Sequence, residues 1–211
     1  MSLSELWSLY GQNYIDALLA TWGMTLESFA IAMVLAVAVT VMRVSPLKPL
    51  RVFGDLYVQV FRNIPGIALL IIVVYALPPL KVVLPYRTCV IVATVLLGSA
   101  FGSENFMSGI NTVGVGQVEA ARSLGMSFSR ILAKIVIPQA LRSSVLPMTN
   151  LFIAVMLTTA LGSQVPLKPQ ELTGVVSYIN TRSLGGVAAF FISRSATWHG
   201  LCGEPHWQLY R

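Results

Sequence analysis

Residues 119–138 read EAARSLGMSFSRILAKIVIP, and this stretch of mixed polar and apolar residues separates two strongly apolar runs. In its second half, apolar residues recur at the spacing of one helix face, whereas Arg130 and Lys134 share the other side. Ser127 suits the N-cap position of this helix, and Pro138 is expected to end it. The apolar residues of the face are Phe128, Ile131, Leu132 and Ile135.

The first half of the stretch predicts another short helix, over residues 117–124. We place Glu119 in its first turn, where a carboxylate suits the helix dipole. Gly125 lies between the two helices, where a sharp turn favours a residue without Cβ. The segment is therefore predicted to be a helix–turn–helix with a small-residue face at Ala120 and Ala121. Periodicity alone leaves open an ordinary amphipathic connector between two membrane spans.

The fixed spacing of these residues resembles the EAA loop of the membrane subunits of ATP-binding-cassette (ABC) importers. In that family the loop forms coupling helices that dock into a cleft on an ATPase subunit. The usual pattern ends in Ile-x-Leu-Pro, and Ile137 replaces the Leu here. The resemblance implies that Ala120, Ala121 and Gly125 approach the partner, while Phe128, Ile131 and Ile135 pack on the chain's own core. It assigns ATPase coupling to Glu119, Ala120, Ala121, Gly125, Ile135 and Pro138.

Three further segments extend the resemblance. Residues 108–117 and 57–65 are similar to segments of polar amino-acid importers. Residues 42–46, MRVSP, together with the loop, look most like the glutamate-type permeases of high-GC Gram-positive bacteria. The resemblance covers roughly residues 21–184, which is most of the chain.

Composition independently indicates a membrane protein. Of 211 residues, 55% are hydrophobic and 10% are charged, whereas soluble domains average about 25% charged residues. We predict an all-α, polytopic protein, and the resemblance implies the core of a type I ABC importer permease with about five transmembrane helices. The last helix, near Leu184, is expected to be incomplete or atypical. The other expected spans are 25–42, 64–80, 88–106 and 145–163.

Basic residues give an orientation. The loops expected inside, with their flanks, hold eight Lys and Arg residues, and those expected outside hold four. The positive-inside rule then places the N-terminus and residues 164–183 outside, and residues 43–51 and 115–142 in the cytoplasm of a bacterial cell. The inner residues are Arg43, Lys48, Arg51, Arg62, Arg122, Arg130, Lys134 and Arg142.

Polar residues at membrane depth are candidates for a translocation path: Glu104, Asn150 and Thr158. The family usually has an Arg three residues after this Glu, but Met107 stands there, so an ion-pair partner of Glu104 is expected to be missing. A Lys of the family is likewise replaced by Leu157. Pro147 and Asn150 predict a kink or a broken helix.

The C-terminus departs from the family, which would continue with an apolar helix. We expect a permease domain over residues 1–193 and an atypical polar tail over 194–211, from a truncated or altered C-terminus. His199, Cys202 and His206 lie on this irregular tail, and three such residues indicate incidental composition rather than a metal site.

The sequence has no GxxxxGK[ST] phosphate loop and no nucleophile–base constellation, so we expect neither an enzyme nor a bound cofactor. The resemblance implies a permease subunit that imports polar amino acids, glutamate or glutamine, with ATP bound by partner ATPases. It also implies a second permease subunit, identical or related, an extracytoplasmic solute-binding protein and the lipid bilayer as partners, and no nucleic acid. Two alternatives stay open: an ATP-independent channel or secondary transporter, and a non-functional truncated paralogue.

Overall fold

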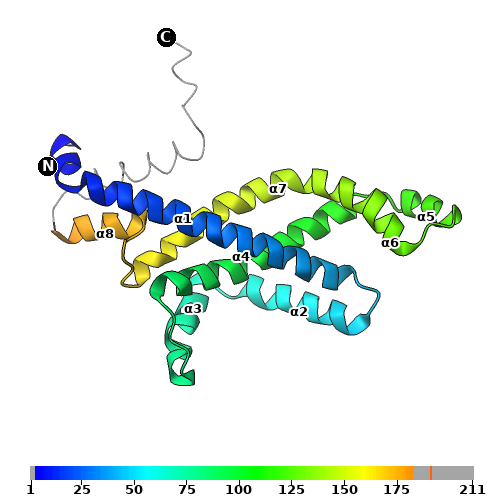
Figure 1. The fold of residues 1–211 in the computed structure, drawn as a ribbon, viewed down its shortest axis with the longest axis horizontal. Coiled ribbons are helices and arrows are strands. Elements are labelled where there is room, and N and C mark those ends of the chain that lie inside the picture. The colour runs from blue at the N-terminus through cyan, green and yellow to red at the C-terminus, as the bar shows by residue number, and fades with distance from the viewer. Residues whose placement is uncertain (1–2, 183–190, 192–211) are drawn as a thin grey trace, which may run out of the picture. The chain divides into compact units, whose positions relative to one another are not determined.

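The computed structural model describes residues 3–182 and 191, and the regular elements among them are all helices (Figure 1). These residues fall into two compact units. Unit 1 comprises residues 3–27, 70–92 and 156–182, and unit 2 comprises residues 28–69 and 93–155. The predicted fifth span, the domain boundary at 193 and the polar tail lie outside the described residues.

The first helix, α1, runs from Leu3 to Val44 and has 42 residues, so it is about 63 Å long. The predicted span 25–42 is therefore part of one continuous helix that begins well before it. Arg43 lies in its last turn, where a cation suits the helix dipole. Pro46 follows, and the residue before a proline is disfavoured in helical conformation, which ends α1.

The second helix, α2 (Lys48–Asn63), begins with Pro49 in its first turn, a position where proline costs no hydrogen bond. After a break at Ile64 and Pro65 come α3 (Gly66–Ile71), the π-helix η1 (Ile72–Ala76) and the 3₁₀-helix η2 (Pro78–Leu80). The predicted span 64–80 is therefore one arm of a bent pair, and α2 is the other arm. Consequently Arg62 lies in the last turn of α2, beside the bend between the two arms, rather than in a loop.

The fourth helix, α4 (Tyr86–Asn111), packs closely in unit 2 through small residues. A Cβ atom added to Gly102 would lie 2.8 Å from the Cβ of Ala36 on α1, and one added to Gly98 would lie 3.2 Å from that of Ala32. Small residues at these positions allow the two helices to approach this closely.

A long helical segment runs from Phe128 to Gln164. It comprises α6 (Phe128–Ile131), the π-helix η3 (Leu132–Val136), α7 (Ile137–Thr158) and the 3₁₀-helix η4 (Thr159–Gln164). The prediction that Pro138 ends the first of these helices is wrong. A proline removes one backbone donor, and the π-turn immediately before Pro138 widens the helix where that donor is missing.

Helix α7 also continues through Pro147 and Asn150, so a broken helix there is wrong. Neighbouring polar groups bind the backbone around this proline. The side-chain amide of Asn105 on α4 donates to the carbonyl oxygen of Pro147 at 3.1 Å. The hydroxyl of Ser144 donates to the carbonyl of Ala140 at 2.8 Å. The bond from Asn105 also ties this part of α7 to α4.

Unit 1 contains α8 (Leu172–Arg182), in the segment predicted to be a loop. Glu171 precedes it and accepts hydrogen bonds from the backbone N–H groups of Thr173 and Gly174 at 2.7 and 2.6 Å. The amide of Leu172 donates to the hydroxyl of Thr21 on α1 at 3.2 Å. Helix α8 thus packs along the first half of α1 (Figure 1). The buried residues they share are Leu6, Tyr14, Ala17, Leu172, Val175 and Ile179.

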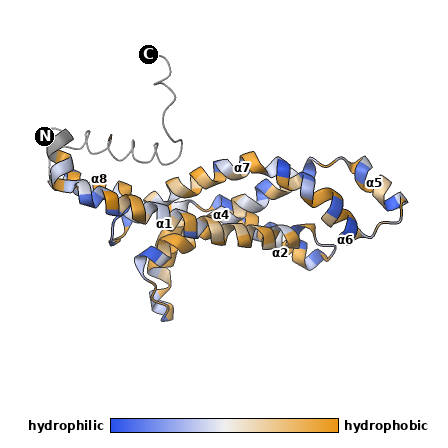
Figure 2. Ribbon diagram, turned by 45° about the horizontal axis from the view of Figure 1, so that its top comes forward, coloured by the Kyte–Doolittle hydropathy of each residue, from blue (hydrophilic) through white to orange (hydrophobic). Residues whose placement is uncertain are grey.

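Within the described residues, three helical segments are long and apolar enough to cross a membrane: 6–44, 86–111 and 128–164. The bent pair of residues 48–63 and 66–80 adds a fourth if it counts as one span. Figure 2 shows hydrophobic residues along most of α1 and a mixture of hydrophilic and hydrophobic residues over α5 (Val115–Ser123) and α6. The chain is a multi-pass membrane protein, as its composition predicted.

Candidate functional site

The helix–turn–helix of the predicted EAA loop is present, and Gly125 forms its turn. Gly125 has φ +76°, a left-handed conformation that side chains with Cβ rarely adopt. Its N–H donates to the carbonyl of Arg122 at 2.9 Å, and the N–H of Met126 donates to the carbonyl of Ala121 at 3.1 Å. This pair of bonds is a Schellman motif, so Gly125 ends α5 and redirects the chain toward α6.

The loop has its own small core, formed of Val113, Ala121, Ile131 and Val136. Ile135 packs against this core, as predicted. Two predictions about its faces are wrong. Ala121 is buried rather than turned to a partner, because it lies opposite Met126 across the Schellman turn. Phe128 is 52% exposed rather than buried, because α6 turns its other side, with Ile131, toward the core.

The turn therefore presents apolar side chains outward. Leu124 is 82% exposed and Phe128 is 52% exposed, on either side of Gly125. We call these three residues, with the exposed Ala120, the apolar tip. The same helix–turn–helix also exposes the cations Arg122, Arg130 and Lys134 and the anion Glu119. An exposed apolar patch with a charged rim is typical of a protein-binding surface.

Two further predictions concern the positions at which the two helices of the loop begin. Helix α5 begins at Val115, so Glu119 is its fifth residue and lies beyond the first turn, contrary to the prediction. Ser127 does occupy the N-cap position of α6, as predicted, with extended backbone angles but without a capping hydrogen bond to its side chain. Sequence reasoning missed Gln117, whose side-chain oxygen Oε1 accepts a hydrogen bond from the side-chain amide of Gln139 on α7 at 2.7 Å. This bond ties α5 to the membrane helix.

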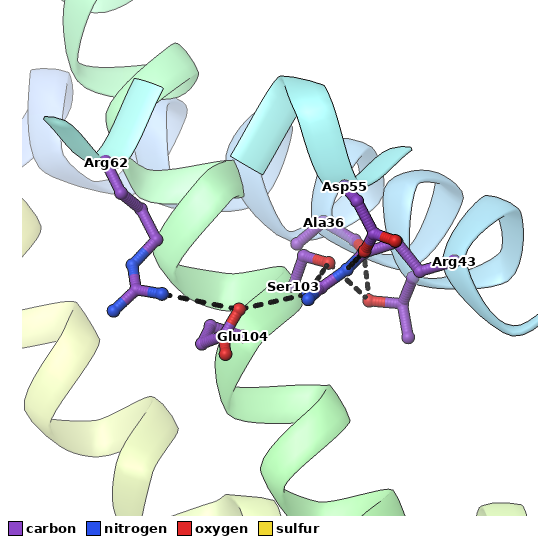
Figure 3. A network of polar contacts seen from close by, with 7 residues as sticks. Ala36, Arg43, Asp55, Arg62, Ser103 and Glu104 are labelled. Atoms are coloured by element: carbon purple, nitrogen blue, oxygen red, sulfur yellow. Dashed lines mark hydrogen bonds and ion pairs between the residues drawn. The ribbon is translucent and has the colours of Figure 1, made fainter. Parts of the chain in front are cut away.

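A second cluster of functional interest is a network of four charged residues in unit 2 (Figure 3). Arg43 at the end of α1 is its centre, with 12% of its side chain exposed. Its Nε donates to Asp55 of α2 at 2.8 Å, and its Nη1 donates to Glu104 of α4 at 3.1 Å and to the hydroxyl of Ser103 at 3.3 Å. Arg43 therefore joins three helices through one guanidinium group.

Glu104 has two cationic partners. Besides Arg43, it pairs with Nη1 of Arg62, from the last turn of α2, at 3.4 Å. Figure 3 shows Glu104 between these two arginines. The expectation that Glu104 lacks an ion-pair partner, drawn from Met107, is therefore wrong. The partners come from other helices, where a search three residues along the same helix does not look.

Two of the three predicted path residues belong to unit 2 and one belongs to unit 1. Glu104 lies in the charged network, and its side chain is 40% exposed. Asn150 is exposed on α7, also in unit 2. Thr158 is partly buried at the end of α7 and belongs to unit 1. Leu157, at the position where the family has a Lys, is 62% exposed.

Solved structures match the fold. One described as a crystal structure of an amino acid ABC transporter with histidines matches with a TM-score of 0.87 and 24% identity, over 95% of this chain and 92% of that chain. One described as an inward-facing conformation of the MetNI methionine ABC transporter matches with a TM-score of 0.64 and 20% identity, over 95% of this chain and 98% of that chain. At these identities, the likeness shows the fold of an ABC importer permease.

Sequence relatives match at higher identity. The glutamate transport system permease protein GluC of Corynebacterium efficiens is 35% identical over 173 residues, which are 76% of each chain. The L-cystine transport system permease protein TcyB of Bacillus subtilis is 31% identical, over 93% of this chain and 85% of its own length. The family model described as binding-protein-dependent transport system inner membrane component matches residues 28–184. The chain therefore belongs to the family of binding-protein-dependent transport system inner membrane components.

Proposed function

We propose that the chain is the permease subunit of an ATP-driven importer for polar amino acids, with glutamate or glutamine as its substrate. Its family supports the importer, and its relatives named for glutamate, cystine and glutamine transport support an amino acid. Residues 1–193 form the permease domain in this proposal. ATP is bound and hydrolysed by partner ATPase subunits, and a second permease subunit and an extracytoplasmic solute-binding protein complete the importer.

The observation that carries the proposal is the apolar tip. Residues 115–142 lie on the cytoplasmic side in this proposal, where Leu124 and Phe128 enter a cleft of the ATPase. The core beneath them is formed by Ala121, Ile131 and Val136, so the tip rests on packed side chains. The tie between Gln117 and α7 gives a route by which motion of the tip reaches a membrane helix. Besides Ala121, the proposed coupling residues are Glu119, Ala120, Gly125, Ile135 and Pro138.

The translocation path in this proposal includes Glu104, Asn150 and Thr158. Charged groups within membrane helices are costly unless they are paired or reach water. Glu104 satisfies both conditions, because two arginines pair with it and 40% of its side chain is exposed. In this proposal, the exposed parts of the charged network give the membrane helices a polar surface along which a polar substrate moves.

The test is reconstitution of the chain with its ATPase and solute-binding protein in proteoliposomes. We expect ATP-dependent uptake of radiolabelled glutamate or glutamine. The double variant Leu124→Ser/Phe128→Ser is expected to insert normally, because both side chains are exposed, and to lose co-purification with the ATPase. Val115→Ser is the matched control, since Val115 is 71% exposed at the far end of α5. Uptake without ATP would instead support a channel or secondary transporter.

A further inference from the structure

Two of the three guanidinium nitrogens of Arg62 are not engaged by the interactions described below. Its guanidinium carbon lies 5.4 Å from the ring centre of Phe101, and its Nη1 pairs with Glu104 at 3.4 Å. In the described part of the chain these are its polar and aromatic-ring interactions, so Nε and Nη2 remain available as donors. Stacking on an aromatic ring orients a guanidinium without consuming an N–H donor. The side chain of Arg62 is 40% exposed, so a ligand can reach it.

Arg43 differs from Arg62 in every one of these respects. It is 12% exposed and holds Asp55, Glu104 and Ser103 at once, with Asp55 at the short distance of 2.8 Å. If Arg62 leaves Glu104, the carboxylate keeps its bond to Arg43. The exchange of one partner by Arg62 therefore leaves Glu104 with one cationic partner, and a carboxylate without any partner is the costly outcome at membrane depth.

We propose that Arg62 binds a carboxylate of the transported amino acid, and that Glu104 is the partner it gives up to do so. This inference rests on the proposed function and adds a residue that recognises the substrate. The ligand is an amino acid with an accessible carboxylate, either the α-carboxylate or that of an acidic side chain. Arginine suits this role because its planar fork binds a carboxylate through two parallel N–H bonds.

Glu104 has a defined part in this arrangement. It occupies one donor of Arg62 when no substrate is bound, so substrate carboxylate and Glu104 compete for the same cation. Neutralising Glu104 is therefore expected to strengthen substrate binding, whereas neutralising Arg62 weakens it. If Arg62 has only a structural role, its loss is harmful because Glu104 loses a cationic partner. Neutralising Glu104 as well would then remove the harm, because a neutral side chain does not require Arg62.

The experiment measures equilibrium binding of radiolabelled glutamate and glutamine to the purified permease–ATPase complex without its solute-binding protein. We expect Arg62→Gln to weaken binding at least tenfold and Arg62→Lys to weaken it less. Glu104→Gln is expected to tighten binding. Arg51→Gln is the control, since Arg51 is exposed near the other end of the same helix. Loss for both amino acids assigns the α-carboxylate, and loss for glutamate alone assigns its side chain.

The double variant Arg62→Gln/Glu104→Gln decides between recognition and structural support. Recognition predicts that it binds as weakly as Arg62→Gln, whereas structural support predicts recovery to the wild-type affinity. Recovery, or unchanged binding by Arg62→Gln, would overturn the inference. A wild-type complex that transports the amino acid but does not bind it in this assay would also overturn the inference. Failure of the proposed function is distinct from these results, since the wild-type importer would then take up neither amino acid with ATP.

Discussion

The carboxylate of Glu104 lies 3.1 Å from the guanidinium of Arg43, although the two residues are 61 positions apart in the chain. This contact joins the end of α1 to α4, and the bond from Arg43 to Asp55 joins the same point to α2. Three helices of unit 2 thus meet at one mostly buried guanidinium. Half-exposed ion pairs contribute little to stability on their own, about 0–1 kcal/mol each. We therefore attribute the stabilising effect of the network mainly to the shared, mostly buried cation.

The first prediction is that Arg43→Gln destabilises the protein more than any other single change in the network. It leaves Asp55 and Glu104 without their common cation, and a lost charged hydrogen bond costs about 1–3 kcal/mol. Thermal unfolding of the detergent-solubilised complex measures the effect. Arg51→Gln is the control and is expected to have no effect, because Arg51 is exposed. A midpoint for Arg43→Gln equal to that of the control would contradict the prediction.

The second prediction concerns the close approach of α1 and α4. Gly102→Ala is expected to destabilise unit 2 by about 1–3 kcal/mol, because its Cβ would lie 2.8 Å from the Cβ of Ala36 and backbone must move. Gly114→Ala is the matched control, since a Cβ there meets nothing within 4 Å. The measurement is again thermal unfolding. Equal midpoints for the two variants would show that the helices separate at no cost.

Local features of the fold were predictable from the sequence, and the reason is that they depend on few neighbouring residues. Gly125 is an example, because a glycine between two amphipathic segments indicates a left-handed turn whatever surrounds it. Ser127 as N-cap follows from the same kind of local rule. The charged network was not predictable in this way. Its partners are set by how α1, α2 and α4 pack, and no spacing rule relates Arg43 to Glu104.

The predicted helix boundaries were wrong for a different reason. By its own chemistry Pro138 predicts a helix end and Pro147 a kink or a broken helix, yet the helical segment continues past both. A π-turn precedes Pro138, and the side chain of Asn105 binds the carbonyl of Pro147. Both features depend on the wider structure. The two faces of residues 119–138 were also predicted only in part. Ala121 is buried and Phe128 is exposed, the reverse of the prediction, because the Schellman turn at Gly125 sets the direction of α6.

The third prediction concerns pH and Glu171. Burial raises the pKa of this carboxyl above its ordinary value, and the hydrogen bonds from the backbone of Thr173 and Gly174 oppose that shift without cancelling it. A raised folded pKa means that the folded state holds the proton more tightly. The contribution of Glu171 to stability is therefore fully present below the ordinary glutamate pKa and is lost as the pH rises through the folded value.

The measurement is hydrogen exchange of the α8 amides between pH 4 and pH 7, after correction for the intrinsic pH dependence of exchange. We expect protection of α8 to fall as the pH rises over this range in the wild type. Glu171→Gln keeps the shape and removes the titration, so its corrected protection is expected to be independent of pH. A pH dependence that persists in Glu171→Gln would assign the effect to another group.

The last prediction concerns coupling at Gly125. Gly125→Val is expected to uncouple the chain from its ATPase, because a β-branched residue is strongly disfavoured at φ +76°. The strain costs about 1–2 kcal/mol or more, and the chain relieves it by changing the angle between α5 and α6. Gly125→Asn is expected to retain part of the coupling, since asparagine tolerates the left-handed region better than valine.

The measurements are co-purification with the ATPase and substrate-stimulated ATP hydrolysis in membranes. Space does not explain the expected loss, because a Cβ at Gly125 meets nothing within 4 Å of this chain. Gly116→Val is therefore the matched control: it also has open space, but it lies in α5 without a positive φ. Wild-type hydrolysis and co-purification in Gly125→Val, with confirmed membrane insertion, would show that the turn at Gly125 is not the coupling element. Equal losses in the two variants would assign the defect to α5 rather than to the turn.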